Sequence, residues 1–102
     1  MFCVNPEQTL FNDVDPATAS KYMAAIQHQP ASGWDDTITY AGWTKIPSTY
    51  LICENDACVP PPMQRQMAEA AKCKVVTCNN GHMVVVGSPE VVVDVIIAAV
   101  KK

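Results

Sequence analysis

Two short apolar runs, each followed by a polar turn, stand out in the second half of the chain. The first covers residues 48–53 (Ser-Thr-Tyr-Leu-Ile-Cys) and the second covers residues 74–78 (Lys-Val-Val-Thr-Cys). Both are rich in β-branched, aromatic or small apolar residues, which favour strands. The polar segments that follow them contain Asn, Asp and Gly, which favour turns. We therefore predict two strands that end in loops.

A helix is predicted after each of these strands. Residues 61–72 carry apolar side chains at helical spacing, and we expect these three to face the core: Met63, Met67 and Ala71. Residues 89–101 are predicted to form a helix that Ser88-Pro89-Glu90 caps, and they are apolar almost all round, so we expect this helix to pack on the sheet. Residues 48–102 are thus predicted to form strand–helix–strand–helix, which is a parallel α/β unit.

The first 44 residues have a different pattern. A helix is predicted over residues 16–28, because Asp15 can cap its first turn and Pro16 suits the first helical position. The pair Gln29-Pro30 is expected to end it. We predict that residues 1–44 form a partial helical lid over the sheet edge, and that residues 45–102 form the sheet part of the domain.

Composition limits the classes of function. The chain has 102 residues, 49% of them apolar, which fits one domain with a real core. The net charge is −3 and no basic run occurs, so we expect no nucleic-acid partner. No apolar run reaches the roughly 18 residues of a membrane span, so we expect no membrane partner. Five cysteines without a visible secretory signal favour reduced thiols in a cytoplasmic protein.

Candidate chemistry lies in the two predicted loops. Asp56 follows the first strand and His82 follows the second, 26 residues later in the chain. Since parallel strands end at the same sheet edge, we expect the two side chains to face each other there. An acid that orients a histidine is the arrangement used for proton transfer. Spacing alone favours the plainer interpretation, in which Asp56 is a turn residue and His82 an exposed loop residue.

The thiols and the other histidine suggest three alternatives. Candidate zinc ligands are the cysteines at positions 53, 58, 73 and 78 together with His82, but four residues separate the members of each cysteine pair, which is a poor match to zinc-ligand spacing. Cys58 is a candidate nucleophile near His82, but a lone loop cysteine is more often inert. His28 is expected to be a solvated residue at the end of its helix. We therefore expect no metal and no cofactor.

One stretch resembles a known family. The run Ile-Pro-Ser-Thr-Tyr-Leu-Ile-Cys-Glu-Asn-Asp-Ala-Cys-Val-Pro, followed later by Asn-Gly-His, is similar to the C-terminal third of an α/β-hydrolase. It resembles in particular the fungal and plant esterase-like group that includes methyl esterases and hydroxynitrile lyases. The resemblance implies that Asp56 is the acid and His82 the base of a Ser-His-Asp triad acting on a small ester-like substrate. Residues 7–44 resemble the end of that family's helical cap.

The chain departs from this family at the nucleophile. None of the glycines, at positions 33, 42, 81 and 87, frames a serine as Gly-x-Ser-x-Gly, and Ser32 lacks the strand–turn–helix setting. The family's oxyanion-hole loop is absent as well. We therefore expect a C-terminal hydrolase fragment, or a truncated gene product, that is inactive alone. The alternative is a non-catalytic fragment that self-associates through its open sheet edge.

Overall fold

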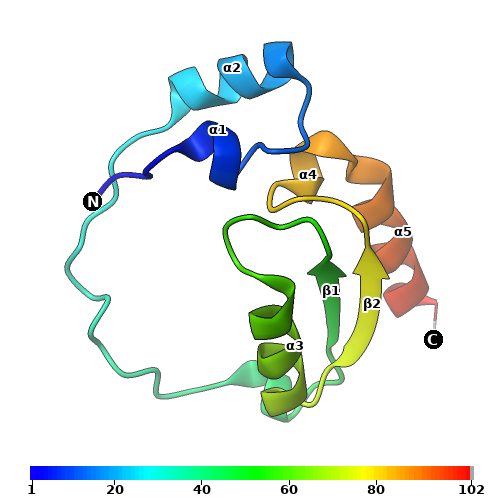
Figure 1. The fold of residues 1–102 in the computed structure, drawn as a ribbon. Coiled ribbons are helices and arrows are strands. Elements are labelled where there is room, and N and C mark those ends of the chain that lie inside the picture. The colour runs from blue at the N-terminus through cyan, green and yellow to red at the C-terminus, as the bar shows by residue number, and fades with distance from the viewer. Residues whose placement is uncertain (102) are drawn as a thin grey trace.

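A parallel pair of strands forms the centre of the protein, for which a computed structural model describes residues 1–101. Strands β1 (Thr49–Cys53) and β2 (Lys74–Cys78) pair in register along their whole length, and α3 (Pro61–Ala70) connects them. The last helix is α5 (Pro89–Val100). In Figure 1 both arrows point towards the same edge, beside the short helix α4 (Val84–Gly87). The predicted α/β strand–helix–strand–helix order is confirmed.

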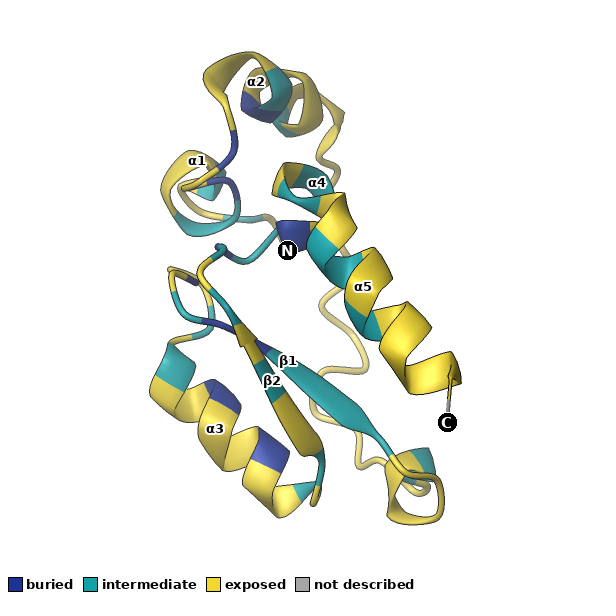
Figure 2. Ribbon diagram, turned by 90° about the vertical axis from the view of Figure 1, so that its right-hand side faces the viewer, coloured by how far each residue is buried: buried dark blue, intermediate teal, exposed yellow. Residues whose placement is uncertain are grey.

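The two long helices lie on opposite faces of the strand pair, as Figure 2 shows. Helix α3 contacts β1 through Gln64 and Ala68, which are its buried residues. The predicted stripe was wrong, because Met63 and Met67 are 51% and 42% exposed. The physical reason is hydrogen bonding: the amide of Gln64 satisfies both backbone groups of Cys53, which no methionine can do.

The N-terminal segment contains α1 (Pro6–Thr9) and α2 (Pro16–Ala25). The Asp15 cap is confirmed, since its carboxylate accepts a hydrogen bond from Thr18 N at 3.0 Å. Helix α2 ends at Ala25 rather than at residue 28. Beyond it the backbone is extended, and Met1 and Gln29 exchange two hydrogen bonds of 2.7 Å. His28 therefore lies outside the helix.

The N-terminal segment packs on the loop that follows β2. Its buried residues Phe11, Val14 and Ala19 form a small core, which Met83 and Val86 contact from the β2 side. Figure 1 shows α1 and α2 beside α4, above the carboxyl ends of the strands. Residues 10–23 thus cover one edge of the sheet. The division of the chain at residue 44 stays a prediction.

Much apolar surface is exposed. Residues 26–41 contain no helix or strand, and η1 (Gly42–Thr44) is a single 3-10 turn that precedes β1. None of the residues of α5 is buried, and Ile96 and Val100 are 56% and 77% exposed. The radius of gyration is 15.2 Å, against about 13 Å for a compact domain of this length. No helix within residues 1–101 is long and apolar enough to cross a membrane.

Candidate active site

The two predicted site residues lie together at the carboxyl edge of the strand pair. His82 Nδ1 is 3.0 Å from Asp56 Oδ2, which is hydrogen-bond distance. The side chain of Asp56 is 5% exposed and that of His82 is 32% exposed. The structure therefore places a buried acid against a histidine whose side chain is partly exposed to solvent.

A turn after β1 fixes the carboxylate of Asp56. Its Oδ1 accepts hydrogen bonds from Cys58 N at 2.8 Å and from Val59 N at 2.9 Å. Its Oδ2 accepts one from Gln64 Nε2 at 3.3 Å and faces His82. An ionised carboxylate can only accept hydrogen bonds, and the two backbone amides and the Gln64 amide group are donors. These hydrogen bonds hold the carboxylate of Asp56 in one orientation.

The hydrogen bond to Asp56 determines the tautomer of His82. Because the carboxylate accepts, Nδ1 has to carry the proton, which leaves Nε2 of the neutral ring as a free acceptor. A histidine held in this way can take a proton at Nε2 while the buried acid stabilises the resulting imidazolium. The pair can therefore serve as a general base.

The two loops are also tied to each other directly. Asn55 N donates to Asn80 O at 3.1 Å, and the side-chain amide of Asn55 donates to Asn79 O. Asn80 in turn donates through its side chain to Ser88 Oγ at 2.8 Å, so Ser88 does not cap α5 with its side chain as predicted. Asn55 thus joins the acid loop to the histidine loop.

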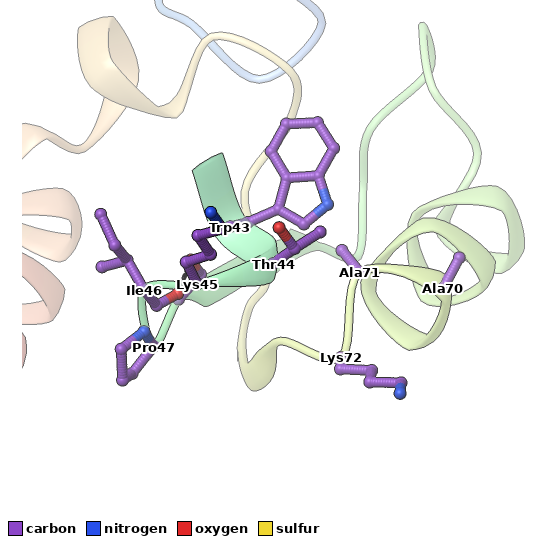
Figure 3. A pocket seen from close by; sticks show the side chains of 9 residues that line it. Trp43, Thr44, Lys45, Ile46, Pro47, Ala70, Ala71 and Lys72 are labelled. Carbon is purple, nitrogen blue, oxygen red and sulfur yellow. Dashed lines mark hydrogen bonds between the residues drawn. The ribbon is translucent and has the colours of Figure 1, made fainter. Parts of the chain in front are cut away.

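An open hollow of about 400 Å³ adjoins the pair. Polar atoms enter it from Asp56, Gln64 and His82, and most of its remaining wall is apolar. The apolar and β-strand residues that line it are Thr49, Tyr50, Leu51, Cys53, Val59, Val84, Val85 and Val92. A second hollow, of about 410 Å³, lies at the other end of β1 between Trp43 and Lys72 (Figure 3). Asp56 and His82 do not line it.

The thiols are poorly suited to act as the nucleophile. Burial raises the pKa of the Cys53 thiol to about 12, and the adjacent Cys78 thiol, with Sγ 3.8 Å away, acts in the same direction. Partial desolvation also raises the pKa of Cys58, and the charge of Asp56 adds to this. Since the thiolate is the reactive form, both shifts reduce reactivity. Among residues 1–101, no three His, Cys, Asp or Glu side chains are grouped to hold a metal.

The serines are not placed to react with His82. Ser48 and Ser88 use their hydroxyls in hydrogen bonds to Ile46 O and Asn80, and Ser32 lies in an exposed turn. Within the described part of the chain, the one side-chain hydrogen bond of His82 is to Asp56. Among residues 1–101, no serine hydroxyl is hydrogen-bonded to Asp56 or His82.

Sequence reasoning missed three residues that support this site. Gln64 is 2% exposed and binds the acid turn, while Asn12 and Asp13 reach the two loops from the N-terminal segment. No sequence signal marked Gln64, because apolar spacing placed Met63 and Met67 on the core-facing side of its helix. Asn12 and Asp13 gave only a turn signal, which says nothing of their distant partners.

Comparison with known proteins gives two matches. A family model described as "Alpha/beta hydrolase family" matches residues 2–95, which include both Asp56 and His82. A protein of Aspergillus novofumigatus (strain IBT 16806) named "Alpha/beta hydrolase nvfD" is 36% identical over 89 residues. The alignment covers 85% of this chain and 36% of that relative. The chain therefore spans about a third of the length of the curated relative that it matches.

Proposed function

The chain belongs to the α/β-hydrolase family, and we propose that it carries the acid and the base of a Ser-His-Asp acyl hydrolase. Asp56 is the acid and His82 the base in this proposal. The observation that supports it is the 3.0 Å hydrogen bond between His82 Nδ1 and the buried Asp56 carboxylate. The substrate class is a small carboxylic ester or a similar acyl compound, and the location is cytoplasmic, in keeping with five free thiols.

The roles follow from the chemistry of the pair. His82 Nε2 takes the proton of a serine hydroxyl as its oxygen attacks the acyl carbon, and then gives that proton to the leaving alcohol. Asp56 keeps the ring in the required tautomer and stabilises its positive charge. Water then attacks the acyl-serine, with His82 as the base again, and releases the acid.

The serine and the oxyanion donors of this mechanism are to be supplied from outside residues 1–102. The sequence contains no Gly-x-Ser-x-Gly, so the chain is proposed to be inactive alone and to function with a part that provides the nucleophile elbow. A base without a nucleophile and without donors aimed at the oxyanion provides little rate enhancement. We therefore expect the isolated chain to hydrolyse p-nitrophenyl acetate no faster than the same concentration of imidazole.

A fusion protein tests the proposal. This chain is joined behind the segment of the Aspergillus relative that precedes the aligned region, and the fusion is treated with a fluorophosphonate probe that labels activated serines. We expect one labelled serine in the fusion. Labelling should fall on the order of 10⁴-fold in His82→Ala and substantially in Asp56→Asn, because serine activation depends on the oriented base. Equal labelling of the fusion and its His82→Ala variant would contradict the proposal.

The second candidate function is a non-catalytic module that self-associates. It is favoured by the outer edge of β2, which pairs with no further strand among residues 1–101, and by the exposed apolar residues of α5, such as Ile96 and Val100. Sedimentation of the isolated chain over a hundredfold range of concentration distinguishes the two. If the isolated chain is a stable dimer and the fusion protein shows no serine labelling, the non-catalytic module is supported. If the isolated chain is a monomer and the fusion protein is labelled, the hydrolase is supported.

A further inference from the structure

A short segment before α2 contacts both loops of the candidate site. Asn12 Nδ2 donates to Asn55 O at 2.8 Å, and Asn55 is the residue before Asp56. Asp13 Oδ2 accepts from Gly81 N at 2.8 Å, and Gly81 is the residue before His82. Two adjacent side chains thus hold the backbone immediately before the acid and immediately before the base.

The histidine loop is held on its other side as well. Met83 N, the amide directly after His82, donates to Leu10 O at 3.3 Å. Phe11 and Val14, which flank Asn12 and Asp13, are 5% and 8% exposed and belong to the small core beneath them. The apolar residues anchor the segment, and the two polar side chains between them are directed at the loops.

Gly81 fits this contact because it has no side chain. A Cβ at this position would lie 2.6 Å from Asp13 Oδ1 and closer still to Asn12 Oδ1. Real Cβ atoms do not approach so closely, so any other residue would push Asn12 and Asp13 away from the loops. Gly81 is itself buried. A glycine directly before His82 therefore allows Asn12 and Asp13 to approach the two loops; we call these two residues the clamp.

We propose that Asn12 and Asp13 are positioning residues that keep His82 in hydrogen-bonding register with Asp56. This rests on the proposed function for its catalytic meaning, although the contact itself concerns only this chain. Each side chain acts on the backbone next to a site residue and touches neither ring nor carboxylate. A misplacement of about 1 Å between catalytic groups is enough to lower a rate substantially, so such bonds matter for a proton-transfer pair.

The test measures the tautomer of His82 without requiring turnover. The full 102-residue chain is labelled with ¹⁵N-histidine, and the ring nitrogens are observed by NMR near neutral pH. The chain has two histidines, and the exposed His28 near the Phe2 ring serves as an internal reference. We expect His82 to carry its proton on Nδ1 and His28 to show the tautomer mixture of a solvated ring.

Of two exchanges of similar size at Asn12 and Asp13, one is expected to disturb the tautomer of His82 and the other to leave it unchanged. Asn12→Asp removes the donor to Asn55 O and places a carboxylate against that carbonyl, so the Nδ1 tautomer of His82 should fall towards the mixture seen for His28. Asp13→Asn keeps an oxygen that can accept from Gly81 N, so His82 should stay as in the wild type. Asp13→Ala removes the acceptor and should resemble Asn12→Asp.

Each outcome decides the proposal. A wild-type tautomer at His82 in folded Asn12→Asp and Asp13→Ala proteins would overturn it, as would a wild-type chain in which His82 and His28 look alike. If Asp13→Ala does not fold, Asn12→Asp alone decides. If Asn12→Asp and Asp13→Ala lose the Nδ1 tautomer of His82 while Asp13→Asn keeps it, the positioning role is supported, even where the fusion protein shows no serine labelling. If the fusion protein is labelled normally but Asn12→Asp and Asp13→Ala keep the wild-type tautomer, the positioning role is refuted and the proposed function is not.

Discussion

Replacing Gln64 by leucine tests the most connected side chain of the site. Gln64 is 2% exposed: Oε1 accepts from Cys53 N at 2.9 Å, and the two hydrogens of Nε2 are shared among three acceptors within hydrogen-bond distance, Val59 O, Cys53 O and Asp56 Oδ2. Glu54 N, the next amide, donates instead to Cys78 O on β2. Gln64 therefore occupies the free edge of β1 where a further strand would otherwise bind.

The expected loss of stability follows from these bonds. Leucine is close to glutamine in volume, so little cavity forms, but the amide of Cys53 and the carbonyl of Val59 both lose their partner, while the Cys53 carbonyl keeps the amide of Asp56 at 3.3 Å. Each unsatisfied buried backbone group costs about 1–3 kcal/mol, or about 2–6 kcal/mol for two. Burial of the leucine side chain returns about 1.5–3 kcal/mol. We expect the free energy of unfolding to fall by about 2 kcal/mol, a large share of the total for a chain with so few buried residues.

Urea denaturation followed by circular dichroism measures this loss. Gln66→Leu is the matched control, because Gln66 lies on the same helix but is exposed, and a surface change of this kind shifts stability by about 0.5 kcal/mol or less. Equal midpoints for Gln64→Leu and Gln66→Leu would refute the reasoning, since the free edge of β1 would then not depend on the amide of Gln64.

Three further outcomes are expected. Asp56→Ala removes the acceptor of His82 Nδ1, so the ¹⁵N spectrum should show a tautomer mixture at His82, and an unchanged spectrum would contradict the assigned bond. At pH 8, Cys53 should be alkylated more slowly than the other four cysteines, since a pKa of about 12 leaves a thiolate fraction on the order of 10⁻⁴. Mass spectrometry of partly alkylated protein measures the order of modification, and early modification of Cys53 would contradict its burial. The hydrogen bond from Thr18 lowers the pKa of Asp15. The stabilisation of α2 by this cap is therefore fully present above the ordinary carboxyl pKa of 3.8 and is lost as the pH falls through the lowered pKa. Helix content measured against pH should show this loss in the wild type and not in Asp15→Ala.

The strands and the placement of Asp56 and His82 were predictable because local pattern determines them. β-Branched and aromatic runs with polar ends gave both strands to within one residue, and parallel pairing then brings the two following loops to the same edge. The capping residue Asp15 and the prolines at helix starts were equally local signals. Each of these depends on residues a few positions apart in the chain.

The buried face of α3 and the supporting contacts were not predictable in this way. Apolar spacing pointed to Met63 and Met67, but the strand edge required a polar partner, and a polar residue that bonds backbone groups has no periodic signature. Helices α1 and α4 have four residues each, too few to show a period. Asn12 and Asp13 bind residues 43 and 68 positions away, so nothing in their own neighbourhood indicates the partner.

The contact between Asp13 and Gly81 also has a consequence for the order of folding. It closes a loop of 68 residues, whereas the bond between Asp56 and His82 closes one of 26. Long loops form late because more chain entropy is lost before the contact contributes, so β1, α3 and β2 should assemble first and the N-terminal segment should dock afterwards. Hydrogen exchange should accordingly be faster at the amide of Gly81 than at the amides within β1, and a local opening that releases residues 10–14 would free the histidine loop while the strands stay paired.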